Sequence, residues 1–293
     1  MWLIALGINL ILFVASTLLR RRYAQSHTVP PSVSVALPYL VGVMPLSFIA
    51  GLLFPHDISW SAWTVWLLLS ASFLVAMFIW LSFMAIKHLP AALNQTIFQV
   101  RVLITILLGW LFLGEKLSSL QMAGALLILA SGILAVWAPA RAHRNGTSPH
   151  THLVKGVLLT LASAAFLGVG VVVEKAALQY MDIGAFFIYG FGLQTVWLTL
   201  LATKEYIRKD PPHISAKLMR ESALLGTVVA GIGISYFIAL SQANNISLIA
   251  SLTAFVLPLT AVAAHFILKE RDDSKLLWTA IALGVTGVII TAL

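Results

Sequence analysis

Residues Ala91–Leu113 read AALNQTIFQVRVLITILLGWLFL, and this stretch decides the class of fold. A helix needs about 20 mostly apolar residues to cross the hydrocarbon core of a bilayer, and this run is long enough. Its apolar residues do not alternate with polar ones, so it does not resemble a strand of a membrane barrel. Its single charge, Arg101, lies near the middle. The run predicts a transmembrane helix that carries one buried cation.

Nine other runs of similar length and apolarity occur along the chain, separated by charges, prolines and polar clusters. They are Met1–Leu19, Val33–Phe54, Trp60–Ile86, Gln121–Ala138, Leu153–Val173, Ile183–Thr203, Leu218–Leu240, Ile246–Leu268 and Leu276–Leu293. The sequence therefore predicts an all-α membrane protein with ten transmembrane helices. The connections between runs are short, so any function must lie among the helices.

The composition excludes a soluble enzyme. Of the 293 residues, 60% are hydrophobic and only 10% are charged, with a mean hydropathy of +0.98, whereas soluble domains carry about 25% charged residues. The net charge of +8 does not indicate nucleic-acid binding, because the basic residues lie between apolar runs, as in the loops of membrane proteins. The absence of cysteine excludes disulfides and thiol catalysis.

The two halves of the chain resemble each other. Gly114–Leu117 (GEKL) ends the fourth run and Lys269–Asp272 (KERD) ends the ninth, and the same spacing places Gly132 on Gly287. Five spans per half is an odd number, so the second half must enter the membrane from the opposite side. We predict two inverted five-helix repeats, residues 1–139 and 153–293, joined by a linker at 140–152. Such repeats are common in secondary transporters, whose substrate site lies where the halves meet.

The segment Leu111–Leu117, followed by Gln121–Val136, resembles the end of an EamA-type repeat of the drug/metabolite transporter superfamily. Residues 257–271, followed by Leu276–Leu293, resemble a second copy. The resemblance implies a multi-pass secondary transporter for efflux or exchange of a small metabolite, amino acid or drug-like compound. Members often have a proline midway through the fourth span. Pro258 is its counterpart in the ninth span and predicts a helix kink, but Leu103 stands in the fourth, which leaves bending there open.

Charge and family give opposite orientations. Fifteen of the 18 Lys and Arg residues lie in the odd-numbered loops, two lie in the even-numbered loops (Lys116 and Lys175), and Arg101 lies within a span. The positive-inside rule then places both termini outside the cytoplasm, whereas members of the resembled family are usually drawn with both termini inside. We follow the charges, and expect a protein of the plasma membrane (the bacterial inner membrane).

Arg101 is the strongest candidate for a functional residue. A charge at mid-membrane costs at least about 2.5–3.5 kcal/mol. On a continuous helix Asn94, Phe98 and Arg101 share one face, with Gln95 and Gln99 beside it. This face predicts a substrate site in which the guanidinium binds a carboxylate or phosphate. The alternative is a structural arginine paired with a buried acid or with backbone carbonyls.

Three further residues in the second half are candidates. Tyr236 and Gln242 are predicted to line the cavity opposite the fourth span, or else to form hydrogen bonds between helices. Glu174 follows the sixth run, and is either a proton-coupling carboxylate, a partner of Arg101 or the polar end of the span. Glu115 and Glu270 lie at span ends, where a role in helix termination is the simpler interpretation.

The sequence gives no catalytic residue, cofactor motif or metal site. The histidines of the central linker, His143, His150 and His152, match no ligand pattern. Without an ATP-binding motif, transport must be driven by the gradient of protons, of another coupling ion or of the substrate itself. The expected partners are therefore a small-molecule substrate and the lipid bilayer, with no nucleic acid. The competing hypothesis is a non-transporting membrane protein that acts as an assembly or interaction partner.

Overall fold

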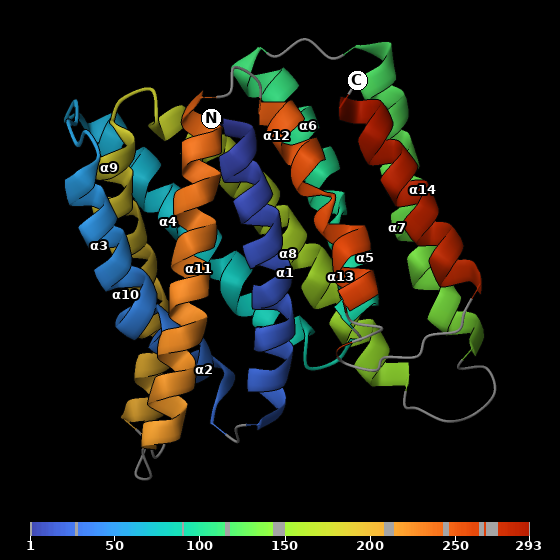
Figure 1. The fold of residues 1–293 in the computed structure, drawn as a ribbon, viewed down its shortest axis with the longest axis horizontal. Coiled ribbons are helices and arrows are strands. Elements are labelled where there is room, and N and C mark those ends of the chain that lie inside the picture. Colours follow the sequence, from blue (N-terminus) through green and yellow to red (C-terminus); the bar gives the residue numbers. More distant parts are fainter. Residues whose placement is uncertain are drawn as a thin grey trace.

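The computed structural model describes residues 2–26, 29–89, 91–114, 118–142, 150–207, 214–242, 246–263, 267 and 275–292. Its regular elements in these ranges are helices (Figure 1), and Ile58 and Met181 add one isolated β-bridge between two loops. The elements in chain order are α1 (Trp2–Ser26), α2 (Pro31–Pro38), η1 (Tyr39–Val43), α3 (Met44–Leu53), α4 (Ala62–Ala85), α5 (Ala91–Phe98), α6 (Val100–Leu113), α7 (Ser119–Ala142), α8 (His150–Ala177), α9 (Ile183–Ala185), η3 (Phe186–Gly190), α10 (Phe191–Tyr206), α11 (Ala216–Gln242), α12 (Ile246–Thr253), α13 (Val256–Ala263) and α14 (Lys275–Ala292). The prediction of an all-helical protein is confirmed for the described residues.

Within the described ranges, seven helices are long and apolar enough to cross a membrane. They are Trp2–Ala24, Pro31–Leu53, Ala62–Ala85, Leu93–Leu113, Leu153–Ala177, Ile183–Thr203 and Ala216–Gln242. Shorter apolar stretches lie in α7 and α14, and the ninth predicted run is described as two short helices, α12 and α13. The chain is thus a multi-pass integral membrane protein.

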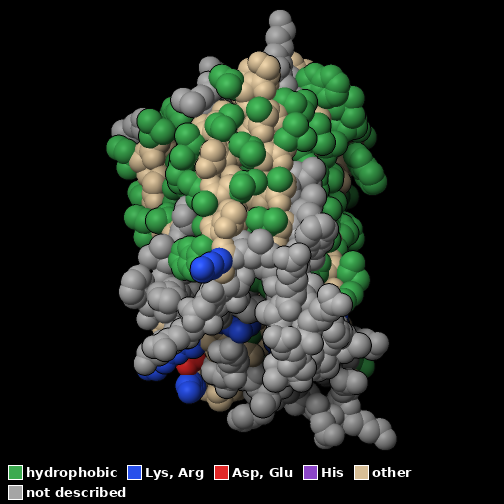
Figure 2. Space-filling model, turned by 90° about the vertical axis from the view of Figure 1, so that its right-hand side faces the viewer, with side chains coloured by type: hydrophobic (Ala, Val, Ile, Leu, Met, Phe, Trp, Pro, Cys, Tyr) green, Lys and Arg blue, Asp and Glu red, His purple; other side chains and the backbone are tan. Residues whose placement is uncertain are grey.

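The outer surface is suited to lipid. Large apolar side chains point outward along the helices, for example Ile11 (69% exposed), Phe112 (70%) and Leu53 (79%). Figure 2 shows hydrophobic side chains over the upper part of one face, whereas the Lys and Arg side chains visible on it gather in the lower part. A water-facing surface would have neither the apolar cover nor this separation.

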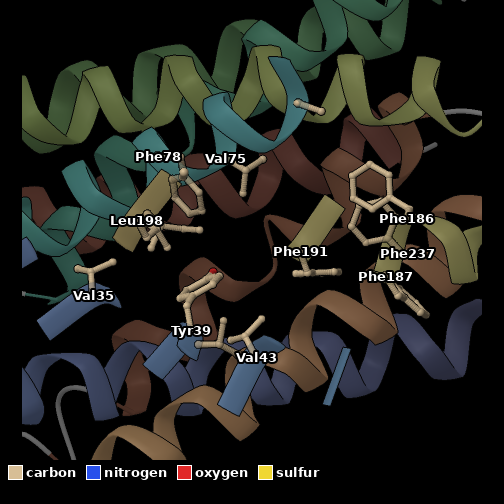
Figure 3. Close-up of a cluster of buried hydrophobic side chains, with 14 of the residues drawn as sticks. Val35, Tyr39, Val43, Val75, Phe78, Phe186, Phe187, Phe191, Leu198 and Phe237 are labelled. Atoms are coloured by element: carbon tan, nitrogen blue, oxygen red, sulfur yellow. The ribbon is translucent and has the colours of Figure 1, made fainter. Parts of the chain in front are cut away.

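Three pairs of long helices make the most extensive contacts: α4 with α8, α1 with α11, and α7 with α14. The short helices connect these pairs, because α6 packs against α8 and α12, and α5 packs against α13. The largest core cluster includes Phe186, Phe187, Phe191 and Phe237 (Figure 3), and the ring centroids of Phe186 and Phe237 lie 4.4 Å apart. These aromatic contacts hold η3 and α10 against α11.

Two helices are interrupted near their middles. Gln99 separates α5 from α6, and Ala254 with Phe255 separates α12 from α13. At the first break the Gln99 N–H donates to the Thr96 carbonyl at 3.3 Å, three residues back rather than four. At the second, Pro258 has no N–H for the Ala254 carbonyl, and Leu257 donates to it at 2.9 Å instead. The fourth run is therefore interrupted even though it has no proline.

Helices η1 and η3 are single π-helical turns inside longer helices, a form that recurs at functional sites. Beside η1, α11 approaches so closely that only glycine fits. A Cβ atom on Gly226 would lie 2.2 Å from the Pro38 carbonyl oxygen, and one on Gly42 would lie 2.6 Å from the Gly226 Cα. The two backbones are thus in direct contact, as small residues permit in membrane bundles.

Candidate functional site

A cavity of about 110 Å³ lies between the pair α1 and α11 and the pair α4 and α8. Figure 3 shows four of its lining residues, Tyr39 from η1, Val75 and Phe78 from α4, and Phe191 from α10. Its polar lining residues are Asn9, Ser16, Arg20, Tyr39, Arg101, Glu174, Gln194, Tyr236 and Thr253. A cavity of this size and polarity admits several water molecules, or a small solute that displaces them.

Arg101 is the second residue of α6 and is only 6% exposed. Its Nη2 atom donates to the Thr253 hydroxyl at 3.1 Å, and its guanidinium lies 5.3 Å from the centre of the Phe98 ring. Its Nε atom has no hydrogen-bond partner among the described residues. The cation is therefore held in place by neutral groups, and its charge remains available to an anion in the cavity.

The two helix breaks produce this arrangement. Thr253 is the last residue of α12, so the hydrogen bond from Arg101 joins the break in one helix to the break in the other. Arg101 also lies at the amino end of α6, where the helix dipole adds partial positive charge. Half-helix termini of this kind face the substrate groups in transporters with broken helices.

Glu174 is 3% exposed and lines the same cavity from α8. No hydrogen bond or salt bridge to its carboxylate is found within the described ranges. Two tyrosines lie within electrostatic reach of it: Tyr39, which also interacts with Arg20, and Tyr236, which also interacts with Arg101. The cavity lining therefore contains one acid, Glu174, and two cations, Arg20 and Arg101, together with both tyrosines.

Of the residues that the sequence singled out, Arg101, Tyr236 and Glu174 line this cavity. Gln242 is exposed at the end of α11. The break at Gln99 places Asn94 and Arg101 on different helices, so the continuous face assumed from the sequence is interrupted.

Three amides of the fourth run are buried outside the set of lining residues. The Asn94 side-chain oxygen accepts a hydrogen bond from Thr160 at 2.7 Å, and the Gln95 Nε2 donates to Thr17 at 3.2 Å. Both side-chain polar atoms of Gln99 lack a hydrogen-bond partner in the described part of the chain. Asn94 and Gln95 thus join the fourth run to α8 and α1.

Sequence reasoning missed Arg20 and Tyr39 as cavity residues. Arg20 follows the predicted span Met1–Leu19 and was counted among the basic residues of the first loop, yet it lies within α1. The positions Asn9, Phe13, Ser16 and Arg20 are spaced by four, three and four residues, which places them on one helix face. This helical spacing was the sequence signal that could have identified Arg20 as a cavity residue. Glu115, Glu270, His143 and most of the linker lie outside the described residues.

No group of three His, Cys, Asp or Glu residues that could hold a metal ion occurs in the described ranges. The geometry instead defines a membrane protein with a polar cavity between two pairs of helices. Residues 1–137 match the model of the EamA-like transporter family. The family resemblance predicted from the sequence is therefore confirmed for residues 1–137.

One named protein and one solved structure are similar to this chain. The chain is 27% identical over 239 residues to the protein named "Uncharacterized transporter YvbV" of Bacillus subtilis (strain 168), which covers 78% of this chain and 71% of that protein. A solved crystal structure, described only as that of a protein, superimposes with a TM-score of 0.69 at 20% identity, over 97% of this chain and 98% of the other. The structural similarity concerns the fold alone, and the family match supports a membrane transporter.

Proposed function

We propose that the protein is a secondary transporter that exports or exchanges a small metabolite, amino acid or drug-like compound by alternating access around the described cavity. One observation carries the proposal: Arg101 is buried in a cavity at the middle of the helix bundle without an acidic partner in the described residues. Burying a charge in this place costs several kcal/mol of stability, so an arginine kept there indicates a function. An assembly partner would have no need of it.

The proposal includes ten spans arranged as two inverted repeats. If the two halves are exchanged, α4 corresponds to α11 and α8 corresponds to α1, so one of these pairs maps onto the other. The pair α7 and α14 maps onto itself. The breaks agree with this exchange, since Gln99 lies 16 residues before Glu115 and Ala254 lies 16 residues before Glu270. The π-helical turns η1 and η3 lie in the second helix of each half. These correspondences favour a pseudo-twofold axis through the cavity.

The lining favours a substrate with an anionic group and an apolar body. Arg101 offers forked donors to a carboxylate or phosphate, and Phe13, Phe78, Phe191 and Phe237 supply apolar surface. Glu174 can accept an amino group if the substrate is zwitterionic, since it lines the same cavity as Arg101. A substrate of this kind would replace the hydration of both charged residues.

Glu174 is also our candidate for coupling to protons. A buried carboxylate that faces a cavity can be protonated on one side of the membrane and release the proton on the other. The charged and titratable groups that face it are Tyr39 from η1, Tyr236 from α11, Arg20 from α1 and Arg101 from α6. Substrate binding at Arg101 would then change the balance of charge around Glu174.

For orientation, we propose that the face bearing the odd-numbered loops is cytoplasmic and that the location is the plasma membrane of a bacterium. The end of α1 and the segment after α4, which carry basic residues, lie on that face. The start of α1 and the end of α14 lie on the other (Figure 1). Positive charge accumulates on the cytoplasmic side of membrane proteins.

The test has two stages. Purified protein is screened by thermal shift against a panel of amino acids, hydroxy acids, amines and sugars, since a ligand that binds only the folded state raises the melting temperature. The ligands found are then assayed for flux in proteoliposomes, with Arg101→Met as the site variant and Arg22→Met, an exposed position on α1, as the matched control. The proposal predicts flux that only Arg101→Met abolishes. It fails if no ligand is found and none of the panel moves.

A further inference from the structure

Two basic side chains bind backbone carbonyls at opposite ends of the cavity. At the carboxyl end of α1, Arg21 Nη1 donates to the carbonyl of Ile86 and, at 2.9 Å, to that of Leu89. At the carboxyl end of α8, Lys175 Nζ donates to the Leu240 carbonyl at 3.0 Å. In each case the acceptors lie in or just after the last turn of another helix, α4 or α11.

Each contact crosses from one helix pair to the other. Arg21 belongs to the pair α1 and α11 and binds the end of α4, whereas Lys175 belongs to the pair α4 and α8 and binds the end of α11. The cavity lies between these two pairs. The contacts are therefore bridges across the cavity rather than bonds within one packed unit.

The two bridges lie on opposite sides of the membrane. A Cβ atom on Gly156 of α8 would lie 2.7 Å from the Leu89 Cγ, so the Arg21 bridge is beside the start of α8. Lys175 is 19 residues further along the same helix. At 1.5 Å per residue the bridges are about 28 Å apart along α8, close to the hydrocarbon thickness of a bilayer.

We propose that Arg21 and Lys175 are two alternating latches, each of which must release before the cavity opens at its own end. This inference rests on the proposed transport function. Carbonyls in the last turn of a helix have no intrahelical partner and carry partial negative charge, so a cation binds them well. Contact between the long helices is extensive within each pair, and each latch joins a side chain of one pair to a helix end of the other.

The charge distribution gives an independent reason to assign Lys175 this role. It is one of only two basic residues in the even-numbered loops, where the positive-inside rule disfavours them. Its half-buried side chain reaches a helix end on the opposite pair. A lysine placed there against the charge bias is explained by closing that end of the cavity.

The test uses a single cysteine in the cavity, Ser16→Cys, in a chain that has no native cysteine. A membrane-impermeant thiol reagent is applied to one face at a time in oriented vesicles. Arg21→Met is expected to raise the labelling rate from the Arg21 face only, and Lys175→Met from the opposite face only, by about two- to thirtyfold, the range for a cation at a helix carboxyl end. Arg22→Met and Lys217→Met, which remove exposed cations, should change neither rate.

Unchanged rates, or a rise from both faces in either variant, would overturn the latches, since general loosening of the bundle opens both ends. Arg21→Lys and Lys175→Arg keep the cation, so their labelling rates should stay within about twofold of the parent rate. Labelling as fast as in the Met variants would also reject the inference. These two variants remain informative if a Met variant does not fold. Substrate flux in vesicles that contain the chain with Ser16 intact separates the two proposals. If the chain transports substrate but the Met variants leave the labelling rate unchanged, only the latches are rejected. If the chain without these substitutions binds no ligand and shows no flux, the transport function is rejected.

Discussion

Replacing Gly226 with alanine should separate α11 from the segment around Pro38 and Gly42. The new methyl group would lie 2.2 Å from the Pro38 carbonyl oxygen and 2.8 Å from the Gly42 Cα. Both neighbours are backbone atoms, so no side chain can rotate away and a helix must move. Gly192 is the matched control, because a Cβ atom there has no atom within 4 Å.

The expected sizes follow from these contacts. Overpacking of this kind costs about 1–3 kcal/mol, which for a chain of this length corresponds to a fall of roughly 2–12 °C in melting temperature. At Gly192 the methyl group meets no obstacle, and alanine is about 1 kcal/mol better than glycine inside a helix. Gly192→Ala should therefore leave the melting temperature unchanged or raise it.

The assay is the thermal unfolding of both variants in the same detergent, followed by tryptophan fluorescence. Because the two substitutions are chemically identical, any effect of alanine itself cancels in the comparison. A Gly226→Ala protein as stable as Gly192→Ala would show that the backbones of η1 and α11 are not in contact, and would remove the basis for placing Tyr39 in the cavity.

Three further results are expected. Arg101→Lys keeps the charge but loses the forked donors, so ligand affinity should fall about 10- to 100-fold, the value of one charge-assisted hydrogen bond; equal affinity by calorimetry would remove Arg101 from the site. Glu174→Gln should abolish the dependence of flux on a pH gradient while substrate exchange continues, and a flux that still follows the gradient would exclude Glu174 as the proton carrier. Alkaline phosphatase fused after Leu293 should be active, because the charge distribution places that end outside the cytoplasm. An inactive phosphatase fusion, together with an active fusion of a reporter that works only in the cytoplasm, would reverse the orientation.

Hydropathy was sufficient to predict the helical class and the approximate helix positions, because lipid imposes length and apolarity on each span. It was not sufficient for the breaks. Without a proline, nothing in the fourth run marks Gln99 as the end of a helix, and the interruption depends on contacts with other helices. The assumed continuous face therefore placed Asn94 beside Arg101, whereas the structure gives Asn94 a hydrogen bond from Thr160.

The candidate site was predictable in part. Arg101 was found because a charge in the middle of an apolar run has few explanations. Arg20 was not, because it precedes two more arginines and the trio resembles an ordinary interfacial cluster. Tyr39 lies in a run with no other sign of function, and only the packing of η1 against α11 brings it to the cavity.

The central claim is that water reaches a cavity between the pairs α1–α11 and α4–α8, and one pair of cysteine variants tests it directly. Phe13 lines the cavity, and Ile11, two residues away on the same helix at nearly the same depth, is 69% exposed on the outer surface. A membrane-impermeant thiol reagent should label Phe13→Cys in the bilayer and leave Ile11→Cys unmodified. Equal labelling at both positions, or none at Phe13→Cys, would contradict the account.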